Sequence, residues 1–347
     1  MKAKTILWAM VLLLSASTGS VYGEYQGYSN TFYGVDAGMN TTVPDGGDTF
    51  IGAHSGQLNI LGLHNTFVGY YAGNFNSTGM RNTFIGYYAG LDNNGRFNTF
   101  IGCNAGGGNT DGEGNTFVGD QSGSSNTDGY SNTFVGQSAG LSNETGVSNT
   151  FVGFKTGLNG ILGSGNTFVG REAGRECGGN RNTMIGEYAG SINNGWYNVF
   201  IGWNAGAYEA GSNKLYIANS DTLTPLIYGD FNSKLLVIHG VLSVASSREY
   251  KENIDQLKPE KAIEILQHLN PVEFSYKATP AGRHLGFISE EVPESLTTKE
   301  RKAVSPMDIV AVLTKVVQEQ QKTMQEQRDA ISTLSKELKE LRCGLGK

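Results

Sequence analysis

The sequence predicts a mostly β chain: a parallel β-roll or solenoid shared by three chains, then a small α+β domain with a C-terminal coiled-coil helix. Three observations predict this fold class. A motif close to N-T-F-[IV]-G-x-x-A-G recurs over residues 30–213, and 43 of the 49 glycines lie between residues 24 and 245. Residues 310–341 carry a heptad pattern of apolar side chains. Glycine at this density destabilises helices, so the repeat is not a two-helix unit.

The first 23 residues have the pattern of a secretory signal peptide. Lys2 and Lys4 give a positive start, residues 6–14 are apolar, and Val21-Tyr22-Gly23 offers small residues at the usual cleavage position. The apolar run is shorter than the roughly 20 residues that span a bilayer. We therefore expect export, a mature chain that begins at Glu24, and a location in the medium or at the cell surface.

The repeat itself predicts one short strand per unit. Its eleven starting positions have a mean step of (198 − 30)/10, or 16.8 residues. Thr-Phe-Ile/Val is a strand-forming triplet, and alternation places Phe on one side and Thr and Ile/Val on the other. Gly86 and its equivalents should end the strand, and Ala89-Gly90 allows a tight corner. The variable half is rich in Asn, Gly, Asp and Ser, which is turn chemistry. The starting positions are 30, 48, 65, 82, 98, 115, 132, 149, 166, 182 and 198.

Stacking the repeats buries an apolar row that one repeat cannot bury alone. Phe should lie over Phe and Ile or Val over Ile or Val along the axis. With two or three large apolar residues per repeat, a single-chain core would be thin, so we expect three chains to share one core. A calcium-binding nonapeptide roll is a poor alternative, because it needs G-G-x-G-x-D at every turn and Asp111 and Asp128 are isolated.

Residues 30–213 resemble the left-handed β-roll heads of trimeric autotransporter adhesins. The shared pattern is Asn, strand, Ile/Val-Gly, small residue, Gly. The heads of that family have a shorter repeat that usually reads Ser-Val-Ala-Ile-Gly, whereas Phe occupies the row here. The resemblance implies a homotrimeric, adhesin-like fibre on a cell surface.

The chain changes character at Ala245-Ser246, where the Gly-rich array gives way to a charged, helix-rich remainder. Three apolar runs between residues 214 and 245 predict a small capping sheet, which an exposed terminal repeat needs. The expected divisions are a signal peptide over 1–23, the repeat array over 24–213, the capping β segment over 214–245, an α+β module over 246–308 and its coiled coil over 309–342.

The C-terminal module has its own secondary-structure signals. Glu260 to His268 predicts a short amphipathic helix ended by Asn270-Pro271, and Val272 to Tyr276 alternates as a strand. From Val310 onward, seam positions recur in alternating steps of three and four, which favours a coiled coil over a helix packed only on its own domain. All are apolar except Gln320 and Gln327, which weaken the seam. The seam is Val310, Leu313, Val317, Gln320, Met324, Gln327, Ile331, Leu334, Leu338 and Leu341.

Four sequence blocks follow one another in this module. They are S-S-R-E-Y-K-E-N-I from 246, L-x-x-L-N-P-V-E-F-S-Y-K from 266, G-F-I-S-E-E-V from 286 and V-V-Q-E-Q-Q from 316. Together they resemble the intramolecular chaperone domain of endosialidases and phage tail fibres, serine-peptidase family 74, over about residues 246 to 342.

The resemblance implies a domain that trimerises, templates folding of the preceding fibre and is released by self-cleavage. The family's Ser–Lys dyad maps onto Ser246 and Lys251, with the cut between Ala245 and Ser246. Ser247 stands where Asp is common, so both serines remain candidate nucleophiles.

The chemistry of such a dyad can be derived from the residues. A serine hydroxyl is a weak nucleophile until a base removes its proton. A lysine amine can be that base only when burial lowers its pKa from about 10.4 toward neutrality. Trimer assembly would desolvate Lys251, so the base would become active only after the fibre has formed. Ser246 would attack the carbonyl of its neighbour Ala245, which needs little further positioning.

Charge, cysteine and histidine patterns exclude several other functions. Residues 24–245 carry 8 Lys+Arg against 16 Asp+Glu, a net charge of −8, and residues 246–347 carry 16 of each. Neither part is basic enough to hold nucleic acid electrostatically. The histidines share no ligand spacing, and we expect no metal and no cofactor. Cys103, Cys177 and Cys343 are too few and too scattered for a disulfide framework.

We therefore expect a secreted homotrimeric fibrous protein whose enzymatic activity is at most one self-cleavage per chain. One alternative is a filament with a permanent, non-cleaving trimerisation domain. Another is a phage-type tail fibre, which the signal peptide argues against. Any cell-surface or extracellular ligand of the fibre is left open by the sequence.

Overall fold

The computed structural model describes residues 29–43, 45–160, 163–243, 245–277 and 279–344. The predicted signal peptide lies outside these residues. The chain forms two compact units, residues 1–242 and residues 243–347, and each is described here by itself.

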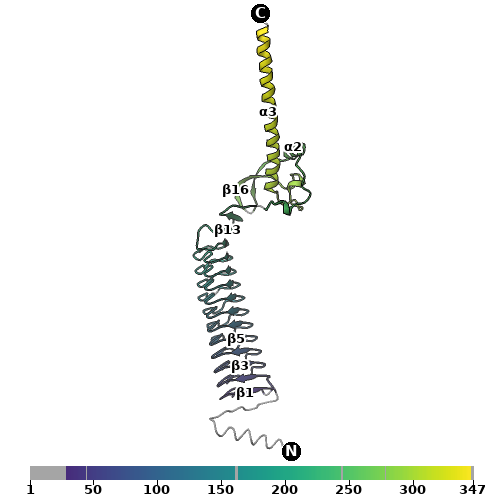
Figure 1. The fold of residues 1–347 in the computed structure, drawn as a ribbon. Coiled ribbons are helices and arrows are strands. Elements are labelled where there is room, and N and C mark those ends of the chain that lie inside the picture. The colour runs from purple at the N-terminus through teal and green to yellow at the C-terminus, as the bar shows by residue number, and fades with distance from the viewer. Residues whose placement is uncertain (1–28, 44, 161–162, 244, 278, 345–347) are drawn as a thin grey trace, which may run out of the picture. The chain divides into compact units, whose positions relative to one another are not determined.

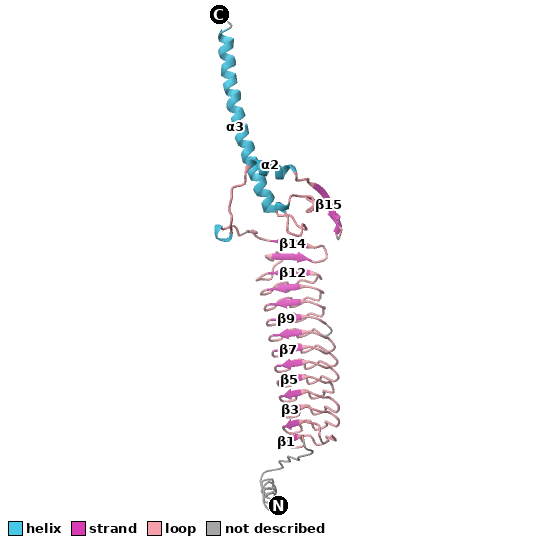
Figure 2. Ribbon diagram, turned by 90° about the vertical axis from the view of Figure 1, so that its right-hand side faces the viewer, coloured by secondary structure: helices cyan, strands magenta, loops and turns pink. Residues whose placement is uncertain are grey.

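The first unit is a parallel β-solenoid of eleven turns, as the repeat predicted. Each turn contributes one three-residue strand, and consecutive strands pair in parallel (Figure 1). The register places Phe67 beside Phe84 and Phe84 beside Phe100 in successive turns. Figure 2 shows the strands stacked in one column with the loops of each turn beside them. The strands are β1 Thr31–Tyr33, β2 Thr49–Ile51, β3 Thr66–Val68, β4 Thr83–Ile85, β5 Thr99–Ile101, β6 Thr116–Val118, β7 Thr133–Val135, β8 Thr150–Val152, β9 Thr167–Val169, β10 Thr183–Ile185 and β11 Val199–Ile201.

The core of the solenoid is a single stack of aromatic rings. The central residue of each strand points inward, and neighbouring rings such as those of Phe100 and Phe117 are parallel with centroids 4.8 Å apart. Phe50 to Phe134 are fully buried within one chain, and Met184 takes the same place in β10. This corrects the expectation of a core shared between chains, because one chain already removes the Phe row from water.

A second buried column consists of asparagines, and sequence reasoning missed half of it. The Asn that opens each repeat, replaced by Asp48 in the second repeat, is buried. Asn82 Oδ1 accepts the backbone N–H of Asn98 at 2.9 Å, and the pattern repeats turn by turn. Asn93 and its equivalents in the variable half are buried too, although we expected solvated turns there. Their amides bond to glycine carbonyl oxygens, which satisfies polar groups inside the solenoid. The second set is Asn59, Asn76, Asn93, Asn109, Asn126, Asn143 and Asn193.

The predicted capping sheet closes the C-terminal end of this unit. β12 (Lys214–Ile217) continues the parallel ladder from β11, whereas β13 (Ile227–Asp230) and β14 (Leu235–Ile238) add to it in antiparallel fashion. Tyr216 continues the buried column, with its ring edge-on to that of Phe200. The change of strand direction ends the repeat.

The second unit is a small α+β module with a long helix, as predicted. A short antiparallel pair, β15 (Val272–Tyr276) and β16 (Thr279–Gly286), accompanies the helices. Ala262 and Ile265 of one helix pack with Val312 and Val316 of the other, and Leu296 joins the same core. The helices are the 3-10 turn η1 (Arg248–Tyr250), α2 (Pro259–Gln267), the 3-10 turn η2 (Glu294–Leu296) and α3 (Pro306–Gly344).

α3 packs on its own module only through its first turns. The apolar residues at the described heptad positions are exposed to solvent in the single chain. Val310 and Leu313 expose 50% and 41% of their surface, and Ile331 and Leu338 expose about three fifths. An apolar stripe of this length is unusual on a solvent-exposed helix. None of the helices in the described part of the chain is both long and apolar enough to cross a membrane.

Candidate active site

The two residues of the predicted dyad are in direct contact. Lys251 Nζ donates a hydrogen bond to Ser246 Oγ at 2.6 Å, and both side chains are exposed in the single chain. Ala245 immediately precedes Ser246, so the carbonyl carbon of Ala245, where the cut is predicted, is bonded to the backbone nitrogen of Ser246, the predicted nucleophile. The structure therefore brings all three predicted site residues together.

A local turn makes this contact. η1 folds the chain between Ser246 and Lys251, and a 3-10 turn advances only about 2 Å per residue. Ser247 starts the turn, because its Oγ accepts the backbone N–H of Glu249 at 3.3 Å. Serine is a favoured residue at such a start, since its short side chain satisfies a backbone donor.

The two candidate serines consequently differ in their surroundings. The Ser246 hydroxyl faces the amine of Lys251, whereas the Ser247 hydroxyl is engaged as a turn cap. A nucleophile needs a base within hydrogen-bond reach. The geometry favours Ser246 over Ser247 for that role.

The arrangement can perform general-base chemistry when the amine is neutral. A lysine ammonium group can only donate hydrogen bonds and cannot take up a proton. A neutral amine in the same place would accept the Ser246 proton instead. In the single chain neither side chain is buried.

The third sequence block has a structural part in the same module. Ser289 Oγ donates to the carbonyl oxygen of Arg301 at 2.6 Å, and Arg301 Nη2 donates to the carbonyl oxygens of Glu290 at 2.6 Å and Val292 at 2.8 Å. These bonds join two loops that precede α3. No hydrogen bond among the described residues links this block to Ser246 or Lys251.

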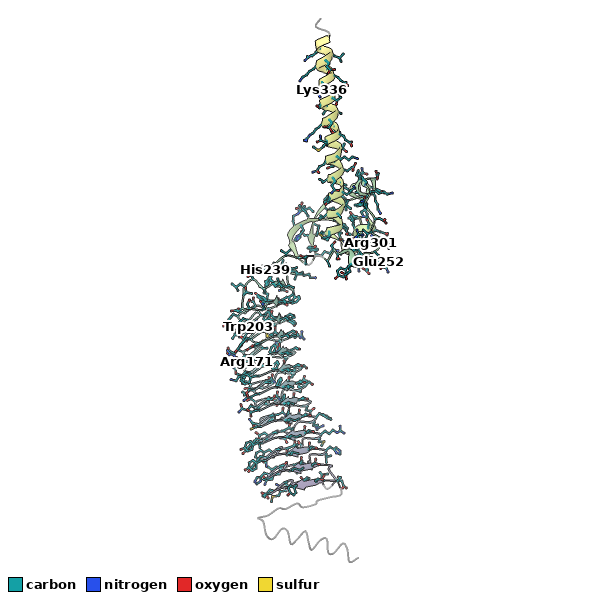
Figure 3. The ribbon with its side chains drawn as sticks, viewed as in Figure 1. Arg171, Trp203, His239, Glu252, Arg301 and Lys336 are labelled. Atoms are coloured by element: carbon teal, nitrogen blue, oxygen red, sulfur yellow. The ribbon has the colours of Figure 1, made fainter. Side chains whose placement is uncertain are left out.

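Other reactive side chains in the described chain include possible metal ligands and free thiols. No group of three or more His, Cys, Asp or Glu side chains there is placed to hold a metal ion. Cys103 and Cys177 are free, and burial raises the pKa of the Cys177 thiol to about 11, so it stays protonated at neutral pH. Figure 3 labels Glu252 and Arg301 in the second unit, and His239, Trp203 and Arg171 in the first.

Part of the C-terminal module is similar to a known family. Residues 246–299 match the Peptidase S74 family model, described as the chaperone of endosialidase. The match begins at Ser246, the residue whose hydroxyl contacts Lys251. It confirms the resemblance that the sequence blocks indicated. No curated protein and no solved structure matches the chain.

Proposed function

We propose that this chain is an exported, homotrimeric, adhesin-like surface fibre whose C-terminal module drives trimer assembly and then cuts itself off. The fibre is the β-solenoid, and the module is the part that matches the chaperone of endosialidase. The observation that carries the proposal is the 2.6 Å contact between Lys251 Nζ and Ser246 Oγ at the start of that match.

The exposed seam of α3 supports assembly into a trimer. Its positions recur every three or four residues, are apolar except at Gln320 and Gln327, and lie outside the module's own core. Burying each such side chain against a partner helix contributes about 1.5–3 kcal/mol, which favours association. The same association brings partner chains to the module and so supplies a means of covering Lys251.

The cut follows from ordinary acyl-transfer chemistry. Neutral Lys251 takes the Ser246 proton, and Oγ attacks the carbonyl carbon of Ala245 through a five-membered ring. The C–N bond breaks as the lysine proton passes to the departing Ser246 nitrogen, leaving an ester. Water hydrolyses the ester and releases the Ala245 carboxylate and a new chain that begins at Ser246. Each chain turns over once.

Denaturing electrophoresis with N-terminal sequencing tests the cut. The fragment from Ser246 to Lys347 has 347 − 246 + 1, or 102 residues. Ser246→Ala and Lys251→Ala should abolish this fragment, because each removes one partner of the dyad. Ser247→Ala is the matched control and should still cleave, since its hydroxyl serves the turn. A fragment that persists in Ser246→Ala would contradict the assignment.

A second candidate function is a filament that keeps the module as a permanent trimer clamp. The exposure of both Ser246 and Lys251 in the single chain favours it, because an exposed ammonium group does not act as a base. Intact wild-type chains in purified trimers, unchanged on long incubation, would support this function over self-cleavage.

A further inference from the structure

The solenoid carries a notch whose composition differs from the rest of its surface. Ser148, Gly165 and Arg181 occupy the same position in three successive turns and so form one column along the solenoid. Because Gly165 has no side chain, it leaves a gap between Ser148 and Arg181. The gap opens into a notch of about 500 Å³. The residues that matter here are Ser164, Gly165, Asn180, Arg181, Trp196 and Tyr197, which we call the Gly165 notch.

The notch has an aromatic wall. Trp196 and Tyr197 expose 53% and 44% of their surface, and they occupy consecutive positions in one turn. Trp196 is held in place, because its backbone N–H donates to Ser212 Oγ at 2.9 Å. Exposed aromatic rings beside polar groups are typical of sites that bind a partly apolar, partly polar ligand, such as a sugar ring.

The polar side of the notch offers mainly donors. Arg181 Nη1 donates to the Tyr197 hydroxyl at 2.8 Å, which leaves its other N–H groups and the Tyr197 hydrogen for a ligand. Asn180 uses its Oδ1 to accept the Ser164 N–H at 2.7 Å, and its amide nitrogen has no acceptor within the described chain. Ser164 Oγ accepts from Val147 at 3.1 Å and keeps its own hydrogen.

Charge then selects the class of ligand. None of the described residues lining the Gly165 notch is acidic, although residues 24–245 have a net charge of −8. A comparable notch at Gly114, with Phe97 and Tyr130 exposed beside it, is lined by Asp111, Glu113 and Asp128. The two notches therefore carry side chains of opposite charge. A carboxylate would be attracted to the first, where Arg181 can bind it, and repelled by the second.

We propose that the Gly165 notch binds a carboxylate-bearing saccharide unit, with its ring on Trp196 and its carboxylate on Arg181. All lining residues come from one chain and from the first unit. Binding at the notch therefore does not depend on cleavage or on the C-terminal module, and either idea can fail alone.

The full-length protein is titrated with a hyaluronan tetrasaccharide, which carries glucuronate carboxylates, and with the neutral tetrasaccharide of N-acetylglucosamine. Isothermal calorimetry should detect binding of the acidic saccharide. The neutral saccharide should bind at least about tenfold more weakly, which is a difference of about 1.4 kcal/mol in binding free energy. Equal binding of both would overturn the role of Arg181, and no binding of the acidic one would overturn the proposal.

Two variants and a control locate the site. Trp196→Ala should weaken binding about tenfold or more. Trp203→Ala should leave binding unchanged, because Trp203 is about as exposed as Trp196 but follows β11, whereas Trp196 precedes it and lines the notch. Gly165→Ser should weaken binding, because its Cβ would lie 3.3 Å from Arg181 Cγ and crowd the side chain that holds the carboxylate. The solenoid should still fold, since serines occupy the same column with positive φ at Ser131 and Ser148. Equal losses in Trp196→Ala and Trp203→Ala, or full binding by Gly165→Ser, would contradict the assignment.

Discussion

At the scale of single residues, two glycines and one buried polar position define each turn. Gly86 follows its strand with φ +145°, and a Cβ there would collide with the carbonyl oxygen of Gly102 in the next turn. A Cβ on Gly90 would collide with the ring of Phe84. The glycines are therefore needed for close approach as well as for backbone freedom. Because the Asn column is buried in the same way, a charged side chain there lowers the stability of the folded chain.

Asp48 is the one acidic residue in that column. Its Oδ1 accepts the Asn65 N–H at 2.8 Å and its Oδ2 accepts from Asn59 at 3.2 Å. Burial raises its pKa from 3.8 to about 7, against smaller opposing effects of these hydrogen bonds. The folded chain therefore holds a proton that the unfolded chain releases between about pH 4 and pH 7.

Asp48→Asn should remove a pH dependence of stability. Because the folded-state pKa is the higher one, the contribution of Asp48 is fully present below about pH 4 and is lost as the pH rises through about 7. The wild-type free energy of unfolding should therefore fall across this range relative to the variant, by an amount on the order of 1–3 kcal/mol. Urea unfolding of both proteins from pH 4 to pH 8 measures the difference. Parallel curves would contradict the prediction.

At the scale of the element, α3 combines two roles on two faces. Val312 and Val316 anchor its first turns in the module, while the heptad seam faces outward. The seam was predicted from the apolar period, and the helix was predicted with it. The sequence did not predict which face of α3 packs against the rest of the module. Valines lie on both faces, and only the position of α2 shows that Val312 and Val316 are the buried ones.

Changing the seam should abolish the proposed trimer. Leu334→Lys with Leu338→Lys places two charges where partner helices would bury apolar side chains. Sedimentation or light scattering should then report a single-chain mass in place of three chains. Thr333→Lys adds a charge off the seam and should keep the trimer. A wild-type protein that is a well-folded single chain would refute trimer assembly by α3.

At the scale of the whole first unit, the solenoid is a one-dimensional stack in which each turn contacts only its neighbours. Its stability is expected to be a sum of turns and of contacts between adjacent turns. The parallel rings of Phe100, Phe117 and Phe134 are the most regular of those contacts. Since one chain buries this row, the solenoid does not rely on partner chains for its core.

Phe117→Ala should destabilise the solenoid by roughly 3–5 kcal/mol, because it leaves a cavity and removes two ring contacts. Tyr130→Ala removes an exposed aromatic ring of the same unit and should cost roughly 0.5 kcal/mol or less. Denaturant unfolding followed by far-UV circular dichroism compares the two variants. Similar midpoints would mean that the buried stack is not what stabilises this unit.

The sequence by itself determined the period, the Thr-Phe-Ile/Val strands and the inward Phe. Those features are local, since alternation along a strand and glycine's backbone freedom act within a few residues. Only the tertiary structure decided that one chain suffices to bury the Phe row, that the second asparagine column is internal, and that Lys251 reaches Ser246. The first two depend on contacts between residues 16 to 18 positions apart, and the third on a turn that spacing alone does not specify.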